Sequence, residues 1–354
     1  MTTMPAGPWV VVVGCHRSGT SAVTGALVSL GLHGVDPSDR MDDPASNPEH
    51  WESQATALWD EALLVGLGGS WDAPPAPDAD WGELRPGHDG TGHDPASIMA
   101  AAYPEPGPLV WKDPRASLLL PYWRGLLPGP LTAVFVWRNP TEVARSLEAR
   151  DGIPFEDGLA LWEWYNRTAA SGLRGIDTFV LDYASVVEHP SATITGLTEW
   201  LTALGRFSPW SDTWDVTRAE TSVHADLVHH RSPVPAHEGD SLPAQEQITK
   251  WLRSSAGGHT PFDSGPPAPS SPWVEAVIRA RRERSHLLRS LAQARVDSAE
   301  HQATIRRLEG ELHAADEMIE GAQLHIERLT ASTSWKITRP LRTVVSRMPG
   351  RPGA

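Results

Sequence analysis

Four consecutive valines, residues 10–13, lead directly into the loop GCHRSGTS at 14–21. A β-branched run of this kind is typical of a strand that is buried on both faces, and the residues from Ser21 to Leu32 are compatible with a helix behind the loop. Strand–loop–helix units build sheets that are covered by helices. The stretch therefore predicts the start of an α/β domain.

Two further segments have the composition of buried strands. One is LTAVFVWRNP at 131–140, which ends at Asn-Pro and is followed by the helix-compatible TEVARSLEAR, and the other is IDTFVLDY at 176–183. Alternating strands and helices predict a three-layer fold with a central parallel sheet. Residues 68–108 are so rich in Pro, Gly and Asp that we expect a long insertion there rather than regular structure.

Composition limits the class of protein. Of the 354 residues, 40% are hydrophobic and 21% are charged, which argues for a globular chain. Cys15 is the only cysteine, which excludes an intrachain disulfide and a thiolate metal cluster and favours a reducing compartment, by default the cytoplasm. No window offers about 18 uninterrupted apolar residues and no leader pattern opens the chain, so we expect neither a membrane span nor a signal peptide.

The net charge of −14 is unevenly distributed along the chain. Residues 273–354 carry 14 Lys/Arg and 10 Asp/Glu, which leaves 16 Lys/Arg and 34 Asp/Glu for residues 1–272. An acidic body does not suit nonspecific binding of nucleic acid. Any anionic ligand of the body must therefore be held by a few well-placed cations.

The C-terminal part has its own pattern. SSAGGHTPFDSGPPAPSSP at 254–272 has the composition of a linker, so we expect a domain over 1–253 and a boundary near 272. Beyond it, residues spaced alternately by three and four form a heptad seam of about six repeats. The seam comprises Leu287, Leu291, Ala294, Ser298, His301, Ile305, Leu308, Leu312, Ala315, Ile319, Ala322, Ile326 and Leu329.

This seam predicts a coiled-coil helix over 273–330 that makes the chain a homo-oligomer through 287–329. Ser298 and His301 weaken its middle, and the alternative is one amphipathic helix that lies on the body.

Residues 331–354 form a tail in which SWKITRPLRTVVSRMPGRPGA has five Lys/Arg and no acid. Such a tail suits anionic lipid headgroups or an acidic partner, or it is simply solvated.

The first loop has the spacing of a phosphate loop without its usual lysine. Gly14 and Gly19 are separated by four residues as in a Walker A motif, but Thr20 stands in the lysine position and Ser21 follows. Backbone N–H groups and a helix N-terminus can still enclose an anion, and Arg17 adds a positive charge inside the loop. This favours an anion that needs little help from a metal, such as a sulfuryl group; an ordinary glycine turn is the alternative.

A second motif, found together with the loop, allows a comparison with a known protein family. In RNPTEVARS, Arg138 ends a predicted strand, and Ser146 lies eight residues later on the following helix. Together the two motifs resemble the sulfotransferases that use 3′-phosphoadenosine 5′-phosphosulfate (PAPS), over roughly residues 9–250. The resemblance implies a P-loop-type fold in which Arg138 and Ser146 hold the 3′-phosphate of the donor. It implies that the 5′-phosphosulfate is held by Arg17, Ser18, Gly19, Thr20 and Ser21.

ATP has no 3′-phosphate, so it would leave Arg138 without its charge-assisted partner. The chain is therefore expected to prefer PAPS. Arg145 is an alternative for either phosphate contact.

Sulfuryl transfer also needs cations where negative charge grows. Arg17 is the first, and Lys112 is the second, because WKDPR at 111–115 resembles a segment of tyrosylprotein and carbohydrate sulfotransferases whose lysine reaches the donor. The alternative for Lys112 is a structural pair with Asp113. Asp113 itself is a candidate to orient Arg115 or to bind acceptor hydroxyls.

The family takes the acceptor proton with a histidine or with a glutamate shortly after the first helix. NPEHWES at 47–53 lies in that place and offers Glu49, His50 and Glu52. We prefer Glu52 as the base, since partial burial would raise its pKa into a useful range, and His50 is next. The alternative is a glutamate that caps a helix or faces solvent.

Late in the body, DLVHHRSP at 226–233 places His229, His230 and Arg231 where family members close over the donor phosphate, with Arg231 the candidate ligand. No other ligand cluster with diagnostic spacing accompanies the two histidines, so we expect no metal.

The acceptor is expected to be a carbohydrate hydroxyl, because SWKITRPLR resembles the ends of bacterial enzymes that build cell-surface polysaccharides. Trp51, Trp59, Trp71 and Trp81 are candidates to stack on it in a cleft, and packing in the core is the alternative and more frequent use of tryptophan.

The sequence therefore predicts a cytoplasmic PAPS-dependent sulfotransferase that acts on a glycan or glycolipid, with contact to the inner membrane face through its tail. Two alternatives stay open. One is a P-loop kinase or triphosphatase that uses ATP and Mg²⁺, and the other is a noncatalytic coiled-coil organiser.

Overall fold

The computed structural model describes residues 3–41, 50–76, 94–223, 243–266 and 269–338. The chain divides into two compact units, 1–286 and 287–354. We describe each unit by itself.

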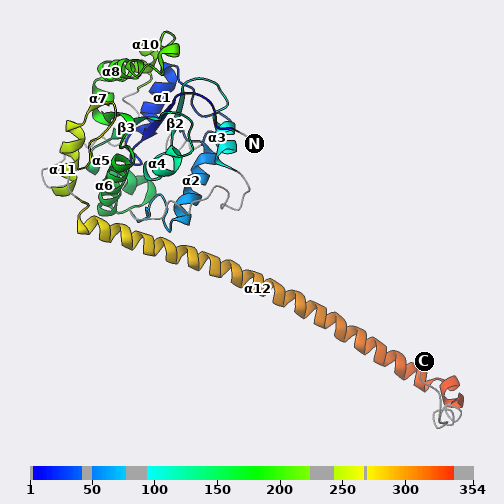
Figure 1. Ribbon diagram of the computed structural model, residues 1–354. Coiled ribbons are helices and arrows are strands. Elements are labelled where there is room, and N and C mark those ends of the chain that lie inside the picture. The colour runs from blue at the N-terminus through cyan, green and yellow to red at the C-terminus, as the bar shows by residue number, and fades with distance from the viewer. Residues whose placement is uncertain (1–2, 42–49, 77–93, 224–242, 267–268, 339–354) are drawn as a thin grey trace. The chain divides into compact units, whose positions relative to one another are not determined.

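The first unit is built on a five-stranded sheet in the order β2-β1-β3-β4-β5 (Figure 1). Strands β1 to β4 run parallel, and β5 pairs with β4 in the antiparallel sense. The strands are β1 Trp9–Val13, β2 Leu109–Lys112, β3 Thr132–Trp137, β4 Asp177–Asp182 and β5 Gly257–His259. The predicted α/β class is confirmed, and the sheet is mostly rather than wholly parallel.

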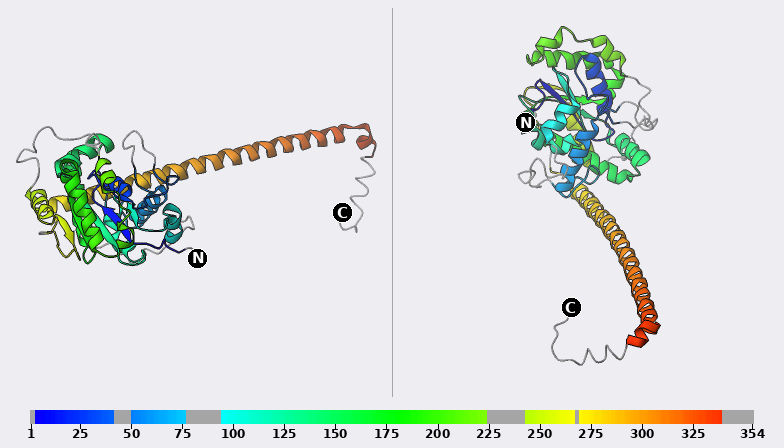
Figure 2. Two further views of the ribbon diagram at one scale, coloured as in Figure 1. Left: turned by 90° about the horizontal axis from the view of Figure 1, so that it is seen from above. Right: turned by 90° about the vertical axis from the view of Figure 1, so that its right-hand side faces the viewer.

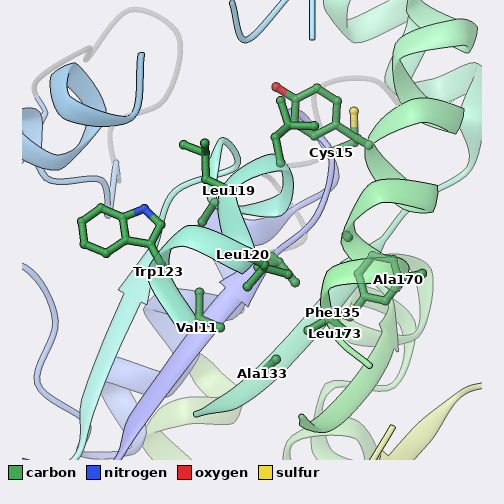
Figure 3. Packing of buried hydrophobic residues seen from close by; sticks show 14 of the residues in the cluster. Val11, Cys15, Leu119, Leu120, Trp123, Ala133, Phe135, Ala170 and Leu173 are labelled. Carbon is green, nitrogen blue, oxygen red and sulfur yellow. The ribbon is translucent and has the colours of Figure 1, made fainter. Parts of the chain in front are cut away.

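The valine run forms the middle of the sheet because both of its faces are covered. Val11 and Val13 pack into one hydrophobic cluster, together with Phe135 of β3 and Trp123 (Figure 3), while Val10 and Val12 pack into a second cluster on the opposite face. All five residues of β1 are buried. Continuous burial explains why the strand reads as an unbroken apolar run.

Helices supply the two covering layers (Figure 1). Helices that contribute to the Val10 face are α1 Thr20–Leu30, α7 Tyr183–Glu188, α8 Pro190–Ala203 and α10 Val216–Thr221. Helices that contribute to the Val11 face are α2 Gln54–Gly66, α3 Pro95–Ala102, α4 Ala116–Arg124, α5 Pro140–Asp151, α6 Phe155–Gly172 and α11 Pro243–Ser254. A one-turn helix, α9, spans Ser208–Ser211.

The expectation of an irregular insertion over 68–108 is wrong for its described end. Helix α3 begins at Pro95, the N1 position that proline favours, and the Asp94 side chain accepts a hydrogen bond from the Ser97 amide. Strand β2 follows at Leu109 and was not predicted. Helix α3 is short and is begun by Asp94 and Pro95 rather than by a long apolar run. The composition of the segment therefore suggested an insertion although a helix forms.

The expectation of a linker over 254–272 is also wrong. This segment contains β5, and Phe262 behind it is fully buried. Gly258 lies under the ring of Trp200, where an added Cβ would stand 2.1 Å from a ring carbon. Close packing against Trp200, rather than flexibility, accounts for Gly258.

Helix α12, Pro272–Ala331, begins inside the first unit. Val274 and Ile278 are buried in the Val11-face cluster, and the Arg281 guanidinium pairs with Asp72 at 2.9 Å and Asp157 at 2.7 Å. The boundary therefore lies after His286 rather than near 272.

The second unit contains the rest of α12, which runs as one helix to Ala331 (Figure 2). The predicted helix over 273–330 is confirmed, whereas its pairing as a coiled coil stays a prediction. Within the part of the chain that the structure describes, no helix is both long enough and apolar enough to cross a membrane.

Candidate active site

The sheet order brings four chain segments to one edge. Strand β1 lies between β2 and β3, so the chain leaves β1 at the point where the winding of the sheet changes direction. Ligands of open parallel sheets bind at the carboxyl ends of the strands at such a point. The segments that follow here are the 14–19 loop, Lys112, Arg138 and Tyr183, at the ends of β1, β2, β3 and β4.

The 14–19 loop needs its two glycines because other groups press on it. A Cβ added to Gly14 would lie 2.2 Å from the Val136 carbonyl oxygen, and one added to Gly19 would lie 2.1 Å from the Tyr183 ring. Hydrogen bonds with the Ser117 hydroxyl, at 2.9 and 3.1 Å, fix the backbone N–H and carbonyl of Gly14. The loop is thereby clamped between neighbouring strand ends.

Arg17 has an unusual backbone. Its φ is 68°, and it is the only non-glycine residue with a positive φ in the described ranges. A side chain in this left-handed region is strained, and such strain persists where the surroundings enforce it, often at functional sites. The conformation places an arginine where a glycine would fit more easily.

Helix α1 begins directly behind the loop with its positive end open. Its N-cap, Gly19, offers no side chain to the first N–H groups, and its first turn contains no acidic residue. The first N–H groups of a helix have no partner within the helix. The Ser18 hydroxyl is buried and has no hydrogen-bond partner among the described residues. This end of the helix is suited to an anion.

The two predicted phosphate motifs converge. Arg17 Nε donates a 2.8 Å hydrogen bond to Ser146 Oγ, across 129 positions of the chain. Arg138 Nη1 lies 3.5 Å from the Arg17 carbonyl oxygen, at the outer limit for a hydrogen bond. Asn139 accepts a hydrogen bond from the Thr141 amide and so starts α5 immediately after the strand. This tight strand-to-helix turn brings Arg138 and Ser146 to the loop.

The Arg138 side chain also contacts a carboxylate and an aromatic ring. Its Nε pairs with Glu142 at 2.7 Å, and its guanidinium lies over the Tyr183 ring at 5.2 Å. Arg145, the predicted alternative, instead lies over the Phe155 ring at 5.2 Å. In this structure the arginine at the strand end, not the one beside Ser146, accompanies the loop.

A pocket of about 260 Å³ opens beside Arg138. Its lining includes Glu142, Asp182, Tyr183, Glu188 and Arg253. Arg253 comes from α11 and lies 5.9 Å from the Trp137 ring. The sequence did not point to Tyr183 or Arg253 as site residues. Tyr183 directly follows a strand, which is a weak indication of a place at the ligand-binding edge, whereas no sequence pattern distinguishes Arg253.

Lys112, at the end of β2, faces the other side of the loop. The lysine is 2% exposed, its ammonium forms a buried ion pair with the Glu52 carboxylate, and it donates a 3.1 Å hydrogen bond to Ser21 Oγ. The partner of Lys112 is Glu52 rather than Asp113, so the alternative pairing with Asp113 is wrong. Lys112 joins the predicted base to the start of α1.

The expected pKa of Glu52 is corrected by this pair. Burial alone would raise the pKa of the carboxyl, but the positive charges around it, Lys112 foremost, lower the pKa to about 2. Ser53, not Glu52, caps α2 by accepting a hydrogen bond from the Thr56 amide. The shift is therefore opposite in sign to the expected one, and Lys112 favours the ionised form of the buried Glu52 carboxylate.

Arg115 ties the surrounding acids together. It pairs with Asp113 at 3.1 Å, with Glu61 at 3.3 Å and with Glu52 at 3.8 Å. Asp113 is fully buried, and this burial raises its pKa despite the nearby guanidinium. The sequence suggested that Asp113 orients Arg115, and the structure has this contact. The link to Glu61 was not foreseen.

The remaining candidates are scattered. His50 is buried, with Nδ1 3.9 Å from a Glu52 oxygen. Trp59 is a core residue that donates to the Tyr122 hydroxyl at 3.2 Å, so for this tryptophan the core-packing alternative holds and a place in an acceptor cleft does not. Trp71 packs on the His16 ring at 4.6 Å, and Trp51 lies under Arg40 at 5.2 Å.

Some predicted residues lie outside the described ranges. They are Glu49, Trp81, His229, His230 and Arg231. Within the described ranges, no group of three His, Cys, Asp or Glu side chains is arranged to hold a metal ion.

Comparisons with known proteins are sparse. No model of a known protein family matches the chain, and no curated protein matches it significantly. Among solved structures, the sulfotransferase domain from the Synechococcus PCC 7002 olefin synthase shares 14% identity over 78% of this chain and 95% of its own, with a TM-score of 0.36. The sulfotransferase domain from the curacin biosynthetic pathway shares 13% over 70% and 98%, also with a TM-score of 0.36. These values are too low to establish a shared fold.

Proposed function

We propose that the first unit has a P-loop-type fold and is a PAPS-dependent sulfotransferase. The observation that carries the proposal is the hydrogen bond from Arg17 to Ser146, which unites the GCHRSGTS and RNPTEVARS motifs at the switch point of the sheet. The two motifs resemble that family separately in the sequence, and their contact supports one shared ligand.

The residues at this edge fit a nucleotide with phosphates at both ends. The open N-terminus of α1 and the buried Ser18 hydroxyl suit the 5′-phosphosulfate, together with Arg17, Gly19, Thr20 and Ser21. Arg138 and Ser146 suit the 3′-phosphate, and Tyr183 provides a ring face in the adjoining pocket. These cations explain how an acidic body can attract a polyanion.

Lys112 and Glu52 are suited to the chemistry of transfer. The bound donor supplies the sulfuryl group: a bond forms between the acceptor oxygen and sulfur, the bond from sulfur to the bridging phosphate oxygen breaks, and adenosine 3′,5′-bisphosphate is the leaving product. Lys112 lies beside Ser21, close to where charge grows on the donor oxygens, and its positive charge would stabilise them. The Glu52 carboxylate would accept the proton of the acceptor hydroxyl. As Lys112 turns toward the donor, Glu52 loses its strongest cationic neighbour and becomes more basic.

We propose a hydroxyl of a glycan or glycolipid as the acceptor. Support comes from the SWKITRPLR segment at 334–342 and its resemblance to the ends of bacterial polysaccharide enzymes. The basic tail would hold the enzyme at the anionic inner face of a membrane from the cytoplasmic side. Purified protein with radiolabelled PAPS, screened against glycans, glycolipids and phenols, identifies the acceptor class.

Titration calorimetry tests the donor. Wild-type protein is expected to bind adenosine 3′,5′-bisphosphate at least tenfold more tightly than adenosine 5′-phosphate, because only the former has a partner for Arg138. Arg138→Ala is expected to remove this difference, and Arg145→Ala, on the helix that follows Arg138, to preserve it. Equal affinity for both nucleotides in the wild type would overturn the proposal, and binding and turnover of ATP with Mg²⁺ would replace it with a kinase or triphosphatase.

A further inference from the structure

The second unit presents an apolar stripe to solvent along α12. Leu308 is 51% exposed, Leu312 is 64% exposed and Ile326 is 58% exposed. The same holds for Leu287, Leu291, Ile305, Ile319 and Leu329, which are 47–67% exposed. An exposed stripe of large apolar residues on a long helix marks an interaction surface.

The residue types along the stripe follow the core positions a and d of a heptad repeat. With Leu287 at position d of the heptad, isoleucine fills three of the six a positions and leucine three of the seven d positions, while Leu291 and Leu312 fill two further a positions. The isoleucines are Ile305, Ile319 and Ile326, and the leucines at d are Leu287, Leu308 and Leu329. Isoleucine at a with leucine at d favours two parallel strands over other coiled coils. Ala294, Ala315 and Ala322 fill further d positions and permit close approach of two backbones.

The charge of this region argues for a second copy rather than a lipid surface. Residues 287–331 carry five Lys/Arg and eight Asp/Glu, whereas helices that lie on anionic membranes have a basic polar face. Most of the exposed large apolar residues lie at positions a and d, and a seam of that kind is narrower than the wide apolar face of such helices. An identical helix offers the same seam in the same register.

We infer that residues 287–329 pair with the same residues of a second copy, as a parallel two-stranded coiled coil. Ser298 at a and His301 at d form polar layers near its N-terminal third, which disfavour shifted registers that would place them against Ile or Leu. Because the strands are parallel, the two 1–286 units emerge from the same end. This inference does not depend on the proposed activity.

Analytical ultracentrifugation of the full chain tests the pairing. The wild type is expected to sediment at twice the chain mass at micromolar concentration, and Leu308→Glu, on the seam, at the mass of one chain. Leu324→Glu is the matched control, because Leu324 is 54% exposed but lies at position f, away from the seam. A monomeric wild type, or equal effects of the two substitutions, would overturn the inference. Unchanged calorimetric binding of a nucleotide that the wild type binds, or an unchanged melting temperature, shows that Leu308→Glu leaves the first unit folded.

Oxidative crosslinking tests the orientation. Cys15 is buried, so an introduced cysteine supplies the accessible thiol. Ala322→Cys protein is expected to form a disulfide-linked dimer of itself, as is Ala294→Cys protein. If the two proteins crosslink only to each other when mixed, the strands are antiparallel and the parallel arrangement is wrong.

Discussion

The two sides of the candidate site hold their charges in different ways. On the phosphate side, the guanidinium groups of Arg17 and Arg138 are positioned by the backbone, by the tight turn into α5 and by Ser146. On the side of the proposed base, Lys112, Glu52 and Arg115 lie within one buried network of ion pairs, and the pKa of Glu52 depends on its neighbours in that network. A substitution on the first side should therefore act locally, whereas one on the second should disturb the whole network.

The largest effect is expected at Lys112. Lys112→Met leaves the buried Glu52 carboxylate without its main partner, which is expected to cost about 3–5 kcal/mol of unfolding free energy and to slow turnover about a hundredfold to a thousandfold. The double variant Lys112→Met/Glu52→Gln should recover most of the stability and none of the activity. Denaturant unfolding of both variants checks this. Additive losses in the double variant would contradict a coupled pair.

Glu52→Gln is expected to slow turnover about a hundredfold while leaving the affinity for adenosine 3′,5′-bisphosphate unchanged. The pH profile adds a sharper test. A carboxyl with a pKa of about 2 is ionised throughout the neutral range, so wild-type kcat/KM should show no acid limb from Glu52 between about pH 5 and pH 8. An acid limb near pH 6 that disappears in Glu52→Gln would mean that burial, not Lys112, dominates this pKa.

Ser146→Ala is expected to weaken binding of adenosine 3′,5′-bisphosphate about tenfold, the value of one hydrogen bond to a charged group. Its melting temperature should hardly change, since the phosphate side is positioned by several independent contacts. Calorimetry and a thermal melt measure the two quantities. A large loss of stability would show that the two sides of the site do not differ in the way described.

The smallest effect is expected at Glu142, and it has the opposite sign. Glu142 pairs with Arg138 and would compete with a bound phosphate, so Glu142→Gln should bind adenosine 3′,5′-bisphosphate about two- to threefold more tightly. Glu148→Gln, which removes one charge from the same helix, is the control. Equal gains in both variants would indicate a general charge effect.

The sequence predicted those elements whose own residues form a recognisable pattern, either a buried apolar run or a motif. Strands β1, β3 and β4 are buried apolar runs, and the loop and the Arg138–Ser146 spacing are visible as motifs. Strand β5 is Gly-Gly-His, and β2 has only four residues, so tertiary packing rather than composition decides both. The pKa of Glu52 was predicted with the wrong sign because its partner lies 60 positions away.

At Arg17, nucleotide binding and main-chain stability make opposite demands, because the left-handed backbone that positions its side chain is strained. A non-glycine residue in this conformation costs of order 1–3 kcal/mol, and glycine adopts it without strain. Arg17→Gly would thus remove a ligand of the nucleotide and relieve the main chain at once. Loss of function accompanied by a higher melting temperature would mark the guanidinium as retained for recognition at the expense of the scaffold.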